Sequence, residues 1–81
     1  MNEIPDMSAE LKQRIEQSIR DAQVEVVAGS ERHYEISVVS PSFEGLSSLK
    51  RQQQVYAAFT DLMAGENAPV HAIDRLQTSS S

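Results

Sequence analysis

Two histidines are the side chains of this sequence that are best suited to chemistry. The chain of 81 residues contains His33 and His71 and no cysteine. A neutral imidazole is a good ligand for iron or zinc. Two imidazoles fill half of a tetrahedral zinc shell and half of the ligand set of a two-iron cluster. A metal bound by this pair would therefore need further ligands from a partner; the alternative for each histidine is an ordinary hydrogen-bonding role.

The sequence shows none of the common catalytic patterns. Without cysteine it has no thiol nucleophile, no disulfide and no thiolate metal site of its own. It contains neither a Gly-x-Ser-x-Gly elbow nor a Gly-x-Gly phosphate-binding loop. Glu25 and Glu35 could face each other across a hairpin, but nothing around them indicates the perturbed pKa that acid–base catalysis needs. We therefore expect a protein that is not an enzyme.

Lys50 and Arg51 form a second candidate site. They begin the second expected helix, where they could contact phosphates or an acidic partner. Twelve acidic residues against seven basic ones give a net charge of −5, which argues against a general affinity for nucleic acids. The alternative for these two residues is a solvated helix face.

Hydrophobic periodicity predicts two helices and three strands. Apolar residues at spacings of three and four mark the helices, and alternating β-branched residues mark the strands. We expect Ser8 to cap the first helix, Ser47 or Ser48 to cap the second, and Gly65 to end it. The expected elements are a helix over 8–22, a strand over 23–28, a strand that begins at His33 and stops before Pro41, a helix over 47–64, a strand over 70–77 and a frayed polar tail over 78–81.

The α-β-β-α-β order predicts a single two-layer α+β domain over residues 1–81. Both helices would pack on one face of a three-stranded sheet. The short link between the first two strands predicts an antiparallel hairpin, and the helix before the third strand allows parallel pairing, so we expect a mixed sheet. His33 and His71 begin the second and third strands. Both histidines would therefore lie at strand ends, from which a side chain can reach a partner.

The composition also bounds the environment of the protein. No apolar run approaches the roughly 18 to 20 residues of a membrane span. We expect no signal peptide, because the sequence does not open with basic residues followed by an apolar stretch. A small domain without disulfides suits a reducing compartment. We expect a cytoplasmic protein without membrane contact that is a monomer or a weak homodimer on its own.

Four segments resemble, in order, the sequence pattern of the BolA family. Arg32-His33-Tyr34 resembles the Ser-His-Phe that opens the family's second strand. Residues 38–45, Val-Val-Ser-Pro-Ser-Phe-Glu-Gly, resemble its hydrophobic strand followed by Ser, two variable residues, Phe, any residue and Gly. Residues 49–56 resemble its helix signature, and Val70-His71-Ala72-Ile73 resembles its closing His-Ala-hydrophobic motif.

The resemblance implies a class II KH-like fold and a protein partner. Members of the family associate with monothiol glutaredoxins, and the heterodimer can hold a [2Fe-2S] cluster, with a glutaredoxin cysteine and the thiol of glutathione on one side. His71 is the ligand that the resemblance implies, and His33 is the remaining candidate for the second ligand. The isolated chain would bind no cluster. The implied role is an adaptor in iron–sulfur assembly, iron homeostasis or stress response.

The resemblance also implies an alternative function. Some members act as DNA-binding regulators, so a KH-like transcriptional regulator with weak DNA binding through Lys50 and Arg51 is the second hypothesis. A KH site grips nucleotides with a Gly-x-x-Gly loop, which this sequence lacks. Gln52 and Gln53 stand where most members have His and Arg, which is similar to the IbaG-like branch of the family.

Overall fold

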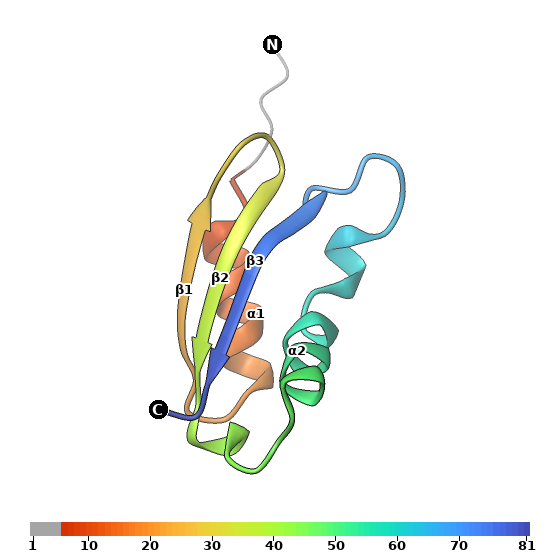
Figure 1. Ribbon diagram of the computed structural model, residues 1–81. Helices are drawn as coiled ribbons and strands as arrows, with labels where there is room; N and C mark the ends of the chain where they lie inside the picture. The colour runs from red at the N-terminus through yellow and green to blue at the C-terminus, as the bar shows by residue number, and fades with distance from the viewer. Residues whose placement is uncertain (1–5) are drawn as a thin grey trace.

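A three-stranded mixed sheet forms one layer of the protein (Figure 1). The computed structural model describes residues 6–81, so residues 1–5 of the expected domain lie outside the described part. The strands are β1 (Gln23–Ala28), β2 (His33–Val39) and β3 (Ala72–Ser79), in this order across the sheet. β1 pairs with β2 antiparallel, and β2 pairs with β3 parallel. The predicted mixed sheet is therefore confirmed.

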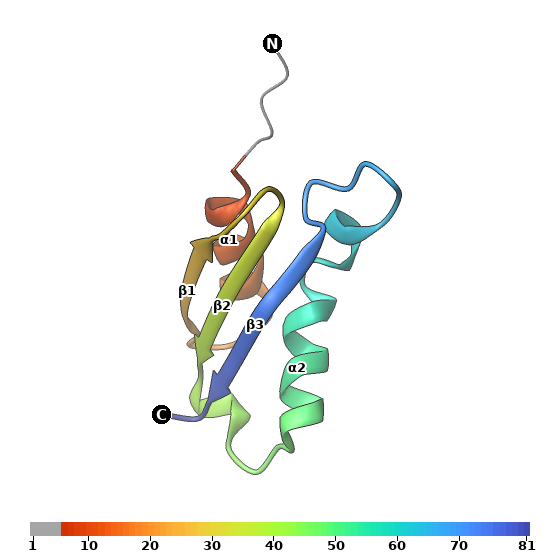
Figure 2. The ribbon, with the colours of Figure 1, turned by 45° about the horizontal axis from the view of Figure 1, so that its top comes forward.

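The two helices form the second layer. α1 (Ser8–Ser18) lies behind β1 and β2 in both views, and α2 (Ser48–Ala57) runs beside β3 (Figure 1, Figure 2). Two short 3-10 turns, η1 (Pro41–Phe43) and η2 (Thr60–Met63), flank α2 along the chain. In the described part of the chain, neither helix has the length and apolar character that crossing a membrane requires. The predicted two-layer α+β architecture is confirmed.

The core lies between the helices and the covered face of the sheet. Tyr34, Ile36 and Val38 of β2 are at most 3% exposed, whereas Glu35 between them is exposed. Burying one side chain of this size contributes about 1.5–3 kcal/mol. The buried apolar cluster consists of Leu11, Ile15, Ile19, Val24, Tyr34, Ile36, Val38, Phe43, Val55, Phe59 and Val70. Because both helices and both strands of the hairpin contribute to it, this cluster holds the two layers together.

The first helix is shorter than its apolar spacing predicts. α1 ends at Ser18, and Ile19 is extended (φ −119°, ψ 122°) yet only 3% exposed. The apolar pattern continues past the helix because the following turn packs on the same core. Ser8 is the first helical residue and not the expected cap. Its N–H donates to Asp6 Oδ1 at 2.8 Å, and hydrogen bonding from Ser8 lowers the pKa of the Asp6 carboxyl.

The helix predicted over 47–64 is divided in two. Its start agrees with the prediction, because Ser47 Oγ accepts from the N–H of Lys50 at 3.2 Å. α2 ends at Ala57, and η2 follows the fully buried Phe59. Apolar spacing does not reveal this break because α2 and η2 pack on the same core. Gly65 (φ 91°) turns the chain after η2 and does not end α2.

Strand β3 is shifted by two residues from the strand predicted over 70–77. Thr78 and Ser79, which were expected in a frayed tail, pair with the last two residues of β2. Main-chain pairing with a parallel neighbour extends the strand here, and it does not require apolar side chains. The prediction of a frayed tail is therefore wrong for these two residues.

Ser40 fixes the turn between β2 and α2. Its buried Oγ donates to the carbonyl oxygen of Arg20 at 2.6 Å and accepts from the N–H of Ser42 at 3.1 Å. Phe43 is fully buried, and Gly45 has a φ of 81°, a region that favours glycine. The Ser-x-x-Phe-x-Gly pattern of residues 40–45 thus has a structural cause at each of its fixed positions.

Candidate metal-ligand pair

The parallel pairing of β2 and β3 brings His33 and His71 to the same end of the sheet. His33 is the first residue of β2, and His71 directly precedes β3. His33 pairs in register with Ala72, the neighbour of His71. The centroids of the two imidazole rings lie 5.4 Å apart, and the ring planes are tilted by 42°. Two side chains that are distant in the sequence are therefore neighbours in space.

The hairpin turn and Asp74 together hold His33. Its N–H donates to the carbonyl oxygen of Ser30 at 2.9 Å, and its own carbonyl oxygen accepts from the N–H of Gly29 at 2.9 Å. The turn passes through Arg32, whose φ is 60°. The Nδ1 atom of the His33 ring lies 2.8 Å from Asp74 Oδ1, and the side chain is 31% exposed. The ring is thus fixed at one nitrogen and still accessible.

The main chain of His71 is fixed, whereas its side chain is exposed. Its N–H donates to the carbonyl oxygen of Arg32 at 2.8 Å. The preceding residue, Val70, is fully buried, and its N–H donates to the carbonyl oxygen of Leu62 at 3.2 Å. His71 therefore presents an imidazole to solvent from a well-anchored backbone.

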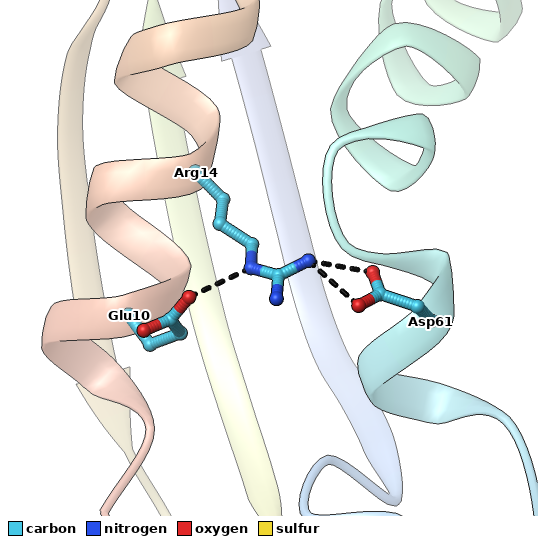
Figure 3. A network of polar contacts seen from close by, with 3 residues as sticks. All are labelled: Glu10, Arg14 and Asp61. Atoms are coloured by element: carbon cyan, nitrogen blue, oxygen red, sulfur yellow. Dashed lines mark hydrogen bonds and ion pairs between the residues drawn. The ribbon is translucent and has the colours of Figure 1, made fainter.

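A polar network anchors the start of the segment that leads to His71 (Figure 3). Arg14 Nη1 on α1 donates to the two carboxylate oxygens of Asp61 in η2, at 2.6 and 2.8 Å. Arg14 Nε donates to Glu10 Oε2 at 2.8 Å. Hydrogen bonding to Arg14 lowers the pKa of the Asp61 carboxyl, and the hydrogen bonds with Glu10 and Asp61 raise the pKa of Arg14. The network ties η2 to α1.

The histidine pair has the spacing of two ligands to one metal ion. Two imidazoles on a tetrahedral ion, with metal–nitrogen distances of about 2 Å, have ring centroids roughly 5 Å apart. The observed separation is 5.4 Å. Among residues 6–81, no group of three or more His, Cys, Asp or Glu side chains is arranged to hold a metal. The centroid separation is therefore compatible with both imidazoles binding one ion.

Sequence reasoning missed Asp74, the hydrogen-bond partner of His33. The pairing of β2 with β3 shifts register by one residue between Tyr34 and Glu35, as at a β-bulge. A signal for it is present in the sequence. Ile73 and Leu76, both partly buried, are three positions apart instead of two, and the residues between them are exposed. This break in alternation indicates an extra residue in the strand.

Lys50 and Arg51 lie away from the histidine pair. The first turns of α2 are beside the end of β3 (Figure 2). Ser48 and Gln52 line a groove there with the last residues of β3. Lys50 is exposed. Arg51 is half-buried, and its Nε donates to the carbonyl oxygen of Phe43 at 3.2 Å, so it supports the η1 turn.

Glu25 and Glu35, which the sequence allows to face each other, are not directly opposite across the hairpin. Glu25 is opposite Ser37, and Glu35 is opposite Val27. The register of a hairpin depends on the length of its turn, which places the two exposed carboxylates diagonally across the strands.

Comparisons with known proteins agree with this fold. The profile of the family described as BolA-like protein matches residues 2–80. BolA-like protein 1 of Bos taurus is 37% identical over an alignment of 79 residues, which covers 86% of this chain and 56% of the relative. The chain thus spans little more than half the length of that curated relative.

Two solved structures show the same arrangement at comparable identity. A bolA protein homologue from Coxiella burnetii has a TM-score of 0.73 and 31% identity, and the match covers 93% of this chain and 91% of that one. BolA1 from Mus musculus has a TM-score of 0.69 and 30% identity, with 94% and 67% of the two chains covered. On the family profile and on these relatives, the chain belongs to the BolA-like protein family.

Proposed function

We propose that this protein is a non-enzymatic adaptor that binds a monothiol glutaredoxin and shares a [2Fe-2S] cluster with it, in iron–sulfur or iron homeostasis. The observation that carries the proposal is the 5.4 Å separation of the His33 and His71 rings at one end of the sheet. His71 is exposed and His33 is partly exposed, so a partner can approach both imidazoles. The cysteine-free chain suits a reducing compartment, and we place this role in the cytoplasm.

The donor set fits one side of such a cluster. His33 and His71 would ligate one iron, and the glutaredoxin cysteine and glutathione would supply the thiolates on the other. Replacing two thiolates by neutral imidazoles reduces the negative charge at the cluster and raises its reduction potential. The contribution of this chain is therefore two imidazoles held at ligand spacing by the main chain.

The nucleic-acid-binding alternative has weaker support. Arg51 donates its Nε to the carbonyl oxygen of Phe43, which leaves Lys50 as the exposed cation of the pair. The chain carries a net charge of −5, and phosphate binding depends on neutralising positive charge. Titration with DNA over a range of salt concentrations tests this alternative.

Reconstitution with a partner tests the proposed function. The protein is mixed with a monothiol glutaredoxin, iron, sulfide and glutathione, and visible circular dichroism follows the cluster. We expect a heterodimer whose spectrum differs from that of glutaredoxin alone, and we expect His71→Ala to abolish this difference. Glu66→Gln is the matched control, because Glu66 and His71 line the same surface hollow. An unchanged spectrum with His71→Ala would overturn the ligand assignment.

A further inference from the structure

Asp74 occupies the one position where β3 departs from regular pairing with β2. Tyr34 pairs with Ile73 and Glu35 pairs with Arg75, so Asp74 has no partner in the register. A bulge adds one residue to a strand and redirects its side chain, and bulges are frequent beside functional sites. Here the extra residue is an exposed carboxylate directly beside a candidate ligand.

The contact between Asp74 and His33 bears on which ring nitrogen of a neutral His33 carries the proton. Asp74 Oδ1 lies 2.8 Å from His33 Nδ1. An ionised carboxylate can only accept a hydrogen bond, so its pairing with a neutral imidazole at this position requires the proton on Nδ1. The lone pair of that imidazole is then on Nε2. The hydrogen bond also restricts rotation of the ring.

The neighbouring cation does not compete for this carboxylate. Arg75 lies against the side-chain amide of Gln77, with 2.6 Å between Arg75 Nη2 and the amide oxygen when the amide is oriented to accept. Among the side-chain hydrogen bonds of the described residues, Asp74 contacts His33.

We propose that Asp74 is a positioning residue that holds His33 as the Nδ1-protonated tautomer, so that Nε2 is the ring nitrogen left with a lone pair for a metal ion. Carboxylates that orient ligating histidines in this way raise ligand basicity, and their loss typically lowers metal affinity by about 10- to 100-fold. The ligand role rests on the proposed function, whereas the tautomer is a property of the metal-free protein.

The tautomer is measured without any metal. Nitrogen-15 NMR of the two imidazoles, at a pH where the spectra show both to be neutral, reports which ring nitrogen carries the proton. We expect His33 to be protonated at Nδ1 in the native protein and to shift toward Nε2 protonation in Asp74→Ala. Asp74→Asn keeps a carbonyl acceptor and should retain part of the native tautomer. His71 is the internal control, and its signals should change little in either variant.

The ligand role is measured in the complex with glutaredoxin. Competition with a chelator should show that Asp74→Ala holds the cluster with an affinity about 10- to 100-fold lower than the native protein does. The affinity of Asp74→Asn should be intermediate, and that of Arg75→Ala should be close to native. Two results would overturn the inference: a native His33 that is protonated at Nε2, or an Asp74→Ala complex that retains the cluster as well as the native one does.

The two proposals fail in different ways. A native complex that never captures a cluster refutes the proposed function and with it the ligand role of His33. The NMR experiment then still decides whether Asp74 sets the tautomer, because it needs neither metal nor partner.

Discussion

The backbone carbonyl oxygen of Arg32 accepts the N–H of His71 at 2.8 Å. It also accepts the N–H of Ala72, at 3.2 Å. These two hydrogen bonds connect the hairpin turn to the start of β3. Both are between main-chain groups, next to His33 and at His71. The imidazoles take no part in them. The position of the histidine pair is therefore set by two backbone segments.

Replacing the imidazole of His71 should leave the fold intact. His71 is exposed, and surface substitutions usually change stability by no more than about 0.5 kcal/mol. We expect His71→Ala to stay within that range in urea denaturation. His71→Pro removes the N–H that Arg32 accepts and should cost about 1 kcal/mol or more. If the alanine variant were as unstable as the proline variant, the side chain would have a structural role and the cluster experiment would need another variant.

Gly45 should be sensitive to substitution for conformational reasons alone. Its φ is 81°, and a Cβ atom built there meets no heavy atom within 4 Å. An L-residue in this region costs about 1–2 kcal/mol, so Gly45→Ala should lower the free energy of unfolding by that amount. Gly45→Asn should cost less, because asparagine tolerates the left-handed region.

Gly29→Ala is the matched control for this effect. A Cβ atom at Gly29 would lie 3.6 Å from the carbonyl oxygen of His33, an ordinary contact. We expect Gly29→Ala to be neutral or to stabilise the protein by up to about 1 kcal/mol. Equal losses at the two positions in thermal denaturation would show that backbone conformation is not the cause.

Ser40 should be the most sensitive serine of the motif over residues 40–45. Its Oγ is buried and makes hydrogen bonds with Arg20 and Ser42. Ser40→Ala removes the donor to one carbonyl and the cap of η1, so we expect a loss of about 1–3 kcal/mol in the free energy of unfolding. Ser42 is exposed, and among the described residues its side-chain hydrogen bond is to Ser40 Oγ. Ser42→Ala should therefore cost clearly less, and the reverse order of the two losses would contradict this account.

The sequence predicts the elements better than their boundaries. Strand β1 has the predicted bounds of residues 23–28, and the β-branched residues Val24, Val26 and Val27 lie inside them. Ile19 and Phe59 are different: both continue an apolar helical spacing, yet both lie outside regular helix. The spacing of apolar residues indicates which side chains reach the core, but it does not indicate which hydrogen bonds the backbone makes. The predicted C-terminal ends of both helices therefore lie several residues beyond the observed ones.

The two histidines of the candidate site are predictable from the sequence, whereas the contacts that support them are not. His33 and His71 follow from residue type and from their places at strand starts. Their proximity depends on parallel pairing between β2 and β3, which the sequence allows but does not specify. The contact of Asp74 with His33 depends on the register shift in β3.

The polar network around Arg14 is predictable only in part. The contact of Asp61 with Arg14 depends on how η2 packs against α1, whereas the Glu10–Arg14 pair follows from a spacing of four residues on a helix.

The Arg14–Asp61 contact should make stability depend on pH in the acid range. Asp61 has an ordinary pKa of 3.8, and hydrogen bonding to Arg14 lowers it in the folded protein. A carboxyl group whose pKa is depressed by folding stabilises the protein above its unfolded pKa, and this contribution is lost as the pH falls through the folded pKa. Asp61→Asn should therefore lower the Tm at pH 7, and the difference from the native protein should narrow below about pH 4 and then close.

Replacing Arg14, the other partner of the contact, provides the control for this prediction. Arg14→Met keeps an unbranched apolar stem but removes the guanidinium, so Asp61→Asn should have little effect on Tm in that background at any pH. Added salt should also narrow the difference between the native protein and Asp61→Asn at pH 7, because the Asp61 side chain is 65% exposed and its charge is screened. Differential scanning calorimetry of the four proteins over pH 2.5–7 checks these expectations. A Tm difference that persisted unchanged at the acid end, or that survived in the Arg14→Met background, would show that Asp61 acts through something other than its charge.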